Sequence, residues 1–294
     1  MAPSEHSPVL YSTSPEGITV ITLNRPHVRN AVNAATASLL AAAFRAFDAD
    51  ATQKVCILTG AGGAFCAGYD LHEIASAPSQ TTSENKPTGA GTEAELQAAP
   101  VRTTSPSDPS TGPMGPSRML LSKPLLAAVA GPAVAGGLEL SLLADVRIAD
   151  STAVFGVFCR RWGVPLIDGG TVRLPAVVGL GRAMDMILTG RPVDAREALG
   201  MGLVNRVVDE GLALEEALRI ARRLVQFPQV CMRADRRSAY YAVFESASLE
   251  DALRFEFQGG KEVVAREGVA GARRFDGGQG RGGSFESGSG KPKL

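Results

Sequence analysis

The chain has 294 residues, of which 45% are hydrophobic, so it can build a large folded core and is not globally disordered. Thirty Lys and Arg residues balance thirty Asp and Glu residues, which leaves no basic surface for nucleic acid or an anionic membrane. Four cysteines without a CxxC pair and three scattered histidines argue against a zinc site and for free thiols in a reducing compartment. The first residues have no signal-peptide pattern, so we expect an intracellular protein, in the cytoplasm or an organelle matrix.

The N-terminal part alternates strand and helix patterns. The β-branched run 18–23 predicts a strand, and the Ala- and Leu-rich run 31–47 predicts a helix. Residues 55–59 predict a second strand, which the glycine-rich turn 60–63 ends. The order strand, helix, strand indicates an α/β domain.

Residues 76–117 have a different composition. They are rich in Ser, Thr, Pro, Gly and Ala and contain no aromatic residue. Such a segment buries too little apolar surface to offset its ordering entropy, so we predict a mobile insert.

Regular patterns resume after this insert. Residues 125–129 predict a buried strand, followed by a small-residue turn at 131–137 and a helix from 138. Short strands are predicted at 146–149 and 153–156. Five helices are predicted at 181–188, 194–200, 213–226, 231–245 and 248–266. The glycine-rich residues 277–294 predict a flexible tail.

Two glycine-rich segments carry the chemical signal. The first is GAGGAFCAGYDLHE (60–73), and the second is AVAGPAVAGGLELSLLAD (128–145). In the second, a glycine turn opens a helix whose free N–H groups and positive dipole end can hold a developing oxyanion. Glu139 follows one turn into this leucine-rich helix, and a buried acid there needs a partner or a function.

Three ordered motifs resemble the signature of the enoyl-CoA hydratase/isomerase (crotonase) family. They are LNRPxxxNA (23–31), ILTGxGxAFCAGxDL (57–71) and AAVxGxAxxGGxEL (127–140). The similarity continues through residues 155–174 and 178–208 and covers roughly 10–275 without the insert.

The resemblance implies a fold and a domain plan. It implies an α/β, crotonase-like spiral of ββα repeats with a C-terminal helical region. On this plan the core spans 1–205 with the insert 76–117, a helical oligomerisation region spans 206–276, and the tail spans 277–294. It also implies a homotrimer or a dimer of trimers.

The resemblance further implies the binding residues. The backbone N–H groups of Tyr69 and Gly136 correspond to the family's oxyanion hole for the thioester carbonyl. The motif positions that correspond to substrate and CoA binding are Arg25, Ala64, Phe65, Ala67, Gly68, Asp70, Leu71 and Gly137.

Glu139 occupies the place of the family's first catalytic glutamate. The second glutamate aligns with Cys159, which is the main departure from the family pattern. Asp168, before two glycines, lies where some family branches carry a functional Asp, so either residue is a candidate for the second group. A turn cap for Asp168 and a core position for Cys159 are the alternative interpretations.

These residues predict an enoyl-CoA hydratase that adds water to a 2-enoyl-CoA through a thioester enolate. The alternatives are a Δ3,Δ2-enoyl-CoA isomerase and a CoA thioester hydrolase or dehalogenase-like enzyme that uses Asp168. A non-catalytic CoA-binding scaffold is the alternative of another class. We expect no separate cofactor or metal, because coenzyme A is part of the substrate, and no nucleic-acid or membrane partner. The C-terminal tripeptide 292–294 is one residue from a peroxisomal address.

Overall fold

The computed structural model describes residues 7–76 and 110–278. Most of the predicted insert, the tail from residue 279 and the C-terminal tripeptide lie outside the described residues.

A six-stranded sheet forms the centre of the molecule, in the order β1-β2-β3-β4-β6-β9. Its strands are β1 (Val9–Thr13), β2 (Ile18–Leu23), β3 (Val55–Gly60), β4 (Leu125–Val129), β6 (Val146–Asp150) and β9 (Arg206–Val208). Only the β1–β2 pair is antiparallel. The buried apolar runs of β3 and β4 are typical of parallel strands that are covered on both faces.

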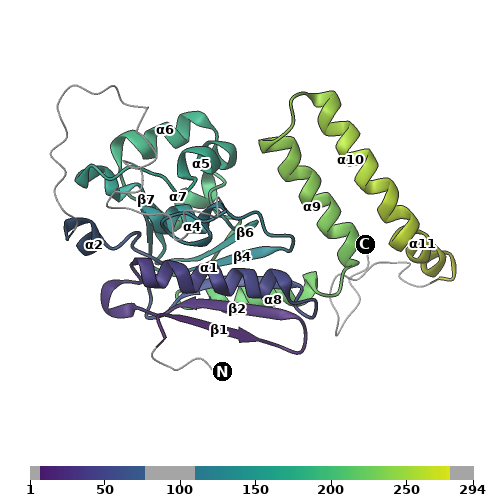
Figure 1. The fold of residues 1–294 in the computed structure, drawn as a ribbon, viewed down its shortest axis with the longest axis horizontal. Helices are drawn as coiled ribbons and strands as arrows, with labels where there is room; N and C mark the ends of the chain where they lie inside the picture. Colours follow the sequence, from purple (N-terminus) through teal and green to yellow (C-terminus); the bar gives the residue numbers. More distant parts are fainter. Residues whose placement is uncertain (1–6, 77–109, 279–294) are drawn as a thin grey trace.

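Two helices cover these two faces. Leu58 of β3 packs in one hydrophobic cluster with Phe44 of α1 (Ala34–Ala49). Ile57, its neighbour in the strand, packs in the other cluster with Ala217 of α8 (Ala213–Leu224). Because successive residues of a strand point to opposite faces of the sheet, β3 contributes side chains to the hydrophobic cores on both faces. Figure 1 shows α1 and α8 on either side of the sheet.

A smaller, three-stranded sheet lies beside the first. It has the order β5-β7-β8, formed by β5 (Pro132–Val134), β7 (Val154–Gly156) and β8 (Val193–Asp194). An isolated bridge from Cys66 to Ala133 joins the loop after β3 to β5. Of the short helices, α4 (Gly136–Ser141) packs on β5, and α7 (Ala195–Gly200) packs on β7 and β8. The others are η1 (Pro26–Val28), α2 (Leu71–Ala75), η2 (Pro116–Arg118), η3 (Phe158–Trp162), α5 (Gly170–Val178) and α6 (Leu180–Thr189).

The last helices form an arm that projects from the core, as Figure 1 shows. It consists of α9 (Gln229–Phe244), α10 (Leu249–Val263), a π-helical turn (Val264–Gly268) and α11 (Val269–Asp276). Arg236 of α9 anchors the arm, because its Nε lies 2.9 Å from both carboxylate oxygens of Asp145 in the core. Across the described residues, no helix combines the length and apolarity that a membrane span requires.

Several sequence expectations need correction. The core does not end at residue 205, because β9 joins the main sheet and α8 packs on it, so the arm begins at α9. The expected mobile insert is folded at its C-terminal end, where Thr111, Met114 and Ser117 are buried. The expected turn 131–137 contains a strand, β5. The strands predicted at 18–23 and 125–129 are confirmed with the same bounds.

Candidate active site

A pocket of about 290 Å³ brings the predicted chemistry together. Its lining includes the oxyanion candidates Tyr69 and Gly136 and the catalytic candidates Glu139, Cys159 and Asp168. The two most distant of them in the sequence are Tyr69, in the loop before α2, and Asp168, in the loop before α5, which are 99 positions apart. A larger hollow of about 430 Å³ lies between η2, α5 and α9, and none of these five residues lines it.

Glu139 is held in the first turn of α4, with only 2% of its surface exposed. Its Oε1 accepts N–H hydrogen bonds from Asp168 at 2.9 Å and from Gly170 at 2.7 Å. No described residue donates a hydrogen bond to Oε2, which leaves this oxygen for the pocket. Burial, and after it the negative charge of Asp168, raises the pKa of Glu139 to about 7. A carboxyl group with this pKa can accept or donate a proton near neutral pH.

Asp168 is also buried, and it is fixed by the folded end of the insert. Its Oδ1 accepts a hydrogen bond from the N–H of Met114 at 3.0 Å and another from the hydroxyl of Ser117. Burial is the largest influence on Asp168 and raises its pKa. Met114 and Ser117 are site residues that sequence reasoning missed, because the low-complexity composition of the insert continues up to them.

The two oxyanion candidates lie on segments that touch. Gly68 has a φ of +101°, and a Cβ on it would lie 2.9 Å from Cβ of Ala135 and 3.1 Å from N of Gly136. Only glycine therefore allows the backbone before Tyr69 to lie against the start of α4. Among the described backbone hydrogen bonds, none is donated by the N–H of Tyr69 or of Gly136. Two unpaired N–H groups beside a buried carboxyl suit an oxyanion-binding site.

Ala67 and Leu71, two of the residues predicted to contact substrate, also line the pocket. Ala64 and Phe65 are instead buried beneath the loop, outside the pocket lining. Gly137 has a packing role, because a Cβ there would collide with the carbonyl oxygen of Cys66.

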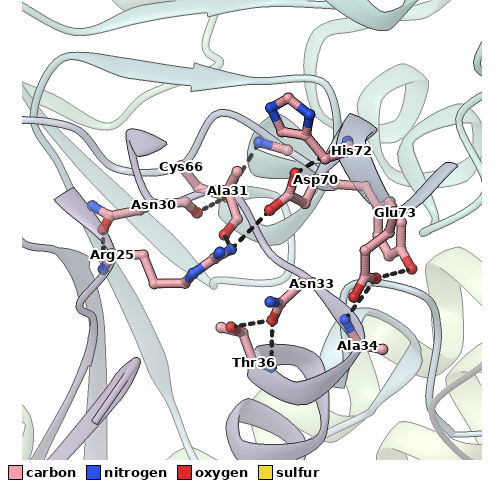
Figure 2. Close-up of polar contacts among 12 residues, drawn as sticks. Arg25, Asn30, Ala31, Asn33, Ala34, Thr36, Cys66, Asp70, His72 and Glu73 are labelled. Atoms are coloured by element: carbon pink, nitrogen blue, oxygen red, sulfur yellow. Dashed lines mark hydrogen bonds and ion pairs between the residues drawn. The ribbon is translucent and has the colours of Figure 1, made fainter. Parts of the chain in front are cut away.

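Arg25 and Asp70 form an ion pair and do not line the pocket. Arg25 Nη1 lies 3.2 Å from Oδ2 of Asp70 and also donates to the carbonyl of Ala31 (Figure 2). Asp70 additionally caps α2 through the N–H of His72. These contacts hold the loop before α2 in place and give both residues a positioning role.

Glu73 is a further positioning residue, and sequence reasoning did not identify it. Its Oε2 accepts a hydrogen bond from the Tyr69 hydroxyl at 2.8 Å and one from the N–H of Ala34 at 2.9 Å. Figure 2 shows Glu73 reaching the first residue of α1. The four-residue spacing from Tyr69 to Glu73 was the available signal.

Cys159 lines the pocket from η3 and is 7% exposed. Burial, and after it the charge of Glu139, raises the pKa of the Cys159 thiol. Within residues 7–76 and 110–278, no group of three or more His, Cys, Asp and Glu side chains could hold a metal ion. The acids and the thiol of the pocket are groups that can transfer protons or act as nucleophiles.

Known proteins share this arrangement of elements. The family model for enoyl-CoA hydratase/isomerase matches residues 13–100 and 119–272. The chain belongs to this family. It is 36% identical to an enoyl-CoA hydratase, EchA19, of Mycobacterium tuberculosis over 69% of each chain. It is 33% identical to the 2,3-dehydroadipyl-CoA hydratase of Escherichia coli, over 75% of this chain and 77% of that one.

A solved structure of an enoyl-CoA hydratase, EchA1, of Mycobacterium marinum matches with a TM-score of 0.76 and 32% identity. The match covers 92% of this chain and 95% of that one. The crotonase fold and an enzyme of the hydratase/isomerase type, both expected from the sequence, are thereby confirmed. Cys159 is the residue of the pocket that differs from the family pattern, because it aligns with the family's second catalytic glutamate.

Proposed function

We propose that the chain is an enoyl-CoA hydratase, in which Glu139 and Asp168 share the proton transfers. The observation that carries this proposal is the buried Glu139 carboxyl in the pocket lining, with one oxygen held by two N–H groups and the other without a hydrogen-bond donor among the described residues. Burial raises the pKa of both carboxyl groups, and the charge of Asp168 raises the pKa of Glu139 further, so the pair can hold one proton near neutral pH. One group can then accept a proton while the other gives one.

The reaction follows from this arrangement. The N–H groups of Tyr69 and Gly136 bind the thioester oxygen and stabilise the enolate. Glu139 takes a proton from water, and the oxygen of that water bonds to C3 of the enoyl group. The C2=C3 electron pair moves into the enolate, and Asp168 delivers a proton to C2. The product is a 3-hydroxyacyl-CoA, and no separate cofactor enters the reaction.

Turnover of crotonyl-CoA tests the proposal. Loss of the enoyl absorbance, with formation of 3-hydroxybutyryl-CoA, is expected for the wild type and not for Glu139→Gln. Glu210→Gln, at an exposed acid outside the pocket, is the matched control and should retain activity. Wild-type chain that binds crotonyl-CoA without converting it would contradict the proposal and favour a non-catalytic CoA-binding protein.

Δ3,Δ2-enoyl-CoA isomerisation is the second candidate function. It is favoured by the thiol of Cys159 at the place of the second glutamate, because a single carboxyl group can move a proton between C2 and C4. Rapid conversion of a 3-enoyl-CoA, with crotonyl-CoA left unhydrated, would identify this reaction.

We also propose self-assembly through the arm α9–α11, as a homotrimer or a dimer of trimers. Exposed apolar side chains on the arm support this proposal: Val243, Phe244, Leu249, Leu253, Phe257, Val264, Val269 and Phe275. Light scattering of the full chain would measure the mass. The peroxisome-like tripeptide lies outside the described residues, and the location of the chain stays a prediction.

A further inference from the structure

The thiol of Cys159 has no assigned role in hydration once Asp168 is the partner of Glu139. It is more than nine-tenths buried and lines the pocket. No side chain of the described residues hydrogen-bonds to its Sγ, and the backbone N–H groups of Cys159 and Arg160 favour the thiolate form. The pocket thus contains a nucleophile without a side-chain partner, in the same lining as the oxyanion candidates Tyr69 and Gly136.

A base for this thiol lies in the same pocket. Glu139 and Cys159 line the same pocket, and Oε2 of Glu139 has no hydrogen-bond donor among the described residues. Because burial favours the neutral thiol, Cys159 needs such a base to become a thiolate. The oxyanion N–H groups of Tyr69 and Gly136 complete the arrangement by withdrawing electrons from a bound thioester.

We propose that Cys159 adds covalently to C3 of a bound 2-enoyl-CoA and forms a thioether with the substrate. This inference rests on the proposed function, because it requires an enoyl thioester in the pocket. The thiol proton passes to Glu139, and Sγ bonds to C3 as the C2=C3 electron pair moves into the enolate. Glu139 then returns the proton to C2. One S–H bond and one π bond are replaced by an S–C and a C–H bond, so no oxidant or other co-reactant is needed.

The adduct fills the acyl site and prevents hydration while it lasts. The same groups reverse it, because Glu139 can remove the C2 proton and the enolate can expel the thiolate. Cys159 therefore makes the enzyme sensitive to its own substrate, most strongly for enoyl groups without a substituent at C3, where the sulfur atom has the least steric hindrance.

Intact-mass spectrometry of the acid-quenched full chain tests the proposal, with crotonyl-CoA as the probe. The wild type should gain the mass of one crotonyl-CoA, and peptide mapping should place it on Cys159. Cys231→Ser removes the exposed thiol and should retain the adduct, whereas Cys159→Ser and Cys159→Ala should lose it. Butyryl-CoA has no C2=C3 bond and should give no adduct. Thermal melting shows that each variant is folded.

The outcomes separate this proposal from the proposed function. Many turnovers to 3-hydroxybutyryl-CoA without any mass gain on Cys159 would overturn the adduct and leave the hydratase intact. A mass gain on Cys159 without turnover would support the adduct and overturn the hydratase. An equal mass gain in Cys159→Ser, located on Cys231, would also overturn the proposal, because it would reflect general thiol reactivity.

Discussion

Asp168→Asn separates the charge of Asp168 from its geometry. The asparagine keeps the backbone N–H that holds Glu139, and its side-chain oxygen can still accept from Ser117 and Met114. The negative charge of the ionised form and the exchangeable proton of the protonated form are both lost. Any change in the protonation of Glu139 then reports on electrostatics rather than on a displaced side chain.

The size of the effect follows from the pKa of Glu139, which is raised from 4.5 to about 7. This difference corresponds to roughly 3 kcal/mol, because one pKa unit is worth about 1.4 kcal/mol. Burial is the larger cause and the charge of Asp168 the next, so removing the charge should lower the pKa of Glu139 by about one unit. Since Glu139 acts in its ionised form, the acid limb of the kcat/KM profile should move to lower pH by this amount.

The loss of the proton donor acts on the rate. If Asp168 protonates C2, the kcat for crotonyl-CoA hydration should fall by about 10²- to 10⁴-fold. Asp209→Asn, at an exposed acid outside the pocket, should change neither the rate nor the profile. Asp168→Asn with near wild-type kcat and an unmoved acid limb would refute the assignment of Asp168 as the partner of Glu139.

Three further predictions concern stability and positioning. Folded Glu139 keeps its proton up to about pH 7, whereas the unfolded residue keeps it only to about pH 4.5. The free energy of unfolding should therefore fall by roughly 3 kcal/mol as the pH rises through this range. Urea titrations of Glu139→Gln should lack this part of the fall. Gly68→Ala should lower kcat by about 10²-fold, because it displaces the backbone that carries the N–H of Tyr69. Gly63 also has a positive φ but has open space around it, so Gly63→Ala should lower the free energy of unfolding by only about 1 kcal/mol and leave kcat unchanged. Arg236→Leu should lower the free energy of unfolding by about 2 kcal/mol, because it removes the charged partner of the partly buried Asp145 carboxylate. Arg237→Leu, at an exposed ion pair, should have a smaller effect. Equal effects would contradict the anchoring role of Arg236.

The sequence predicted the parts of the fold that rest on local patterns. The β-branched run at 18–23 and the apolar run at 125–129 form strands with the predicted bounds. The helix predicted from 138 exists as α4, although it begins two residues earlier, because the glycine pair 136–137 is already helical. The strand β5 was missed because its three residues lie within a run of small residues that is typical of a turn.

Sequence reasoning named pocket residues that lie at glycine-rich turns, and it missed residues that meet there from distant segments. Tyr69, Gly136 and Glu139 follow glycine-rich turns and all line the pocket. The contacts of Asp168 with Met114 and Ser117 join residues that are 54 and 51 positions apart, and no local pattern records such a pair. Composition was misleading here, because the insert ends in folded residues that its Ser, Thr, Pro and Gly content did not suggest.

The segment Asp168-Gly169-Gly170 has a second function beyond supplying an acid. Its N–H groups at 168 and 170 hold Oε1 of Glu139, and a Cβ on residue 170 would lie only 2.8 Å from Cγ of Glu139. Glycine at 170 therefore lets the segment approach closely enough to fix one carboxylate oxygen and leave the other for the pocket. The turn that begins at Asp168 therefore orients Glu139 through its backbone, whereas the Asp168 carboxyl group accepts hydrogen bonds from Met114 and Ser117 instead of capping the turn. A catalytic role for this carboxyl group stays a prediction.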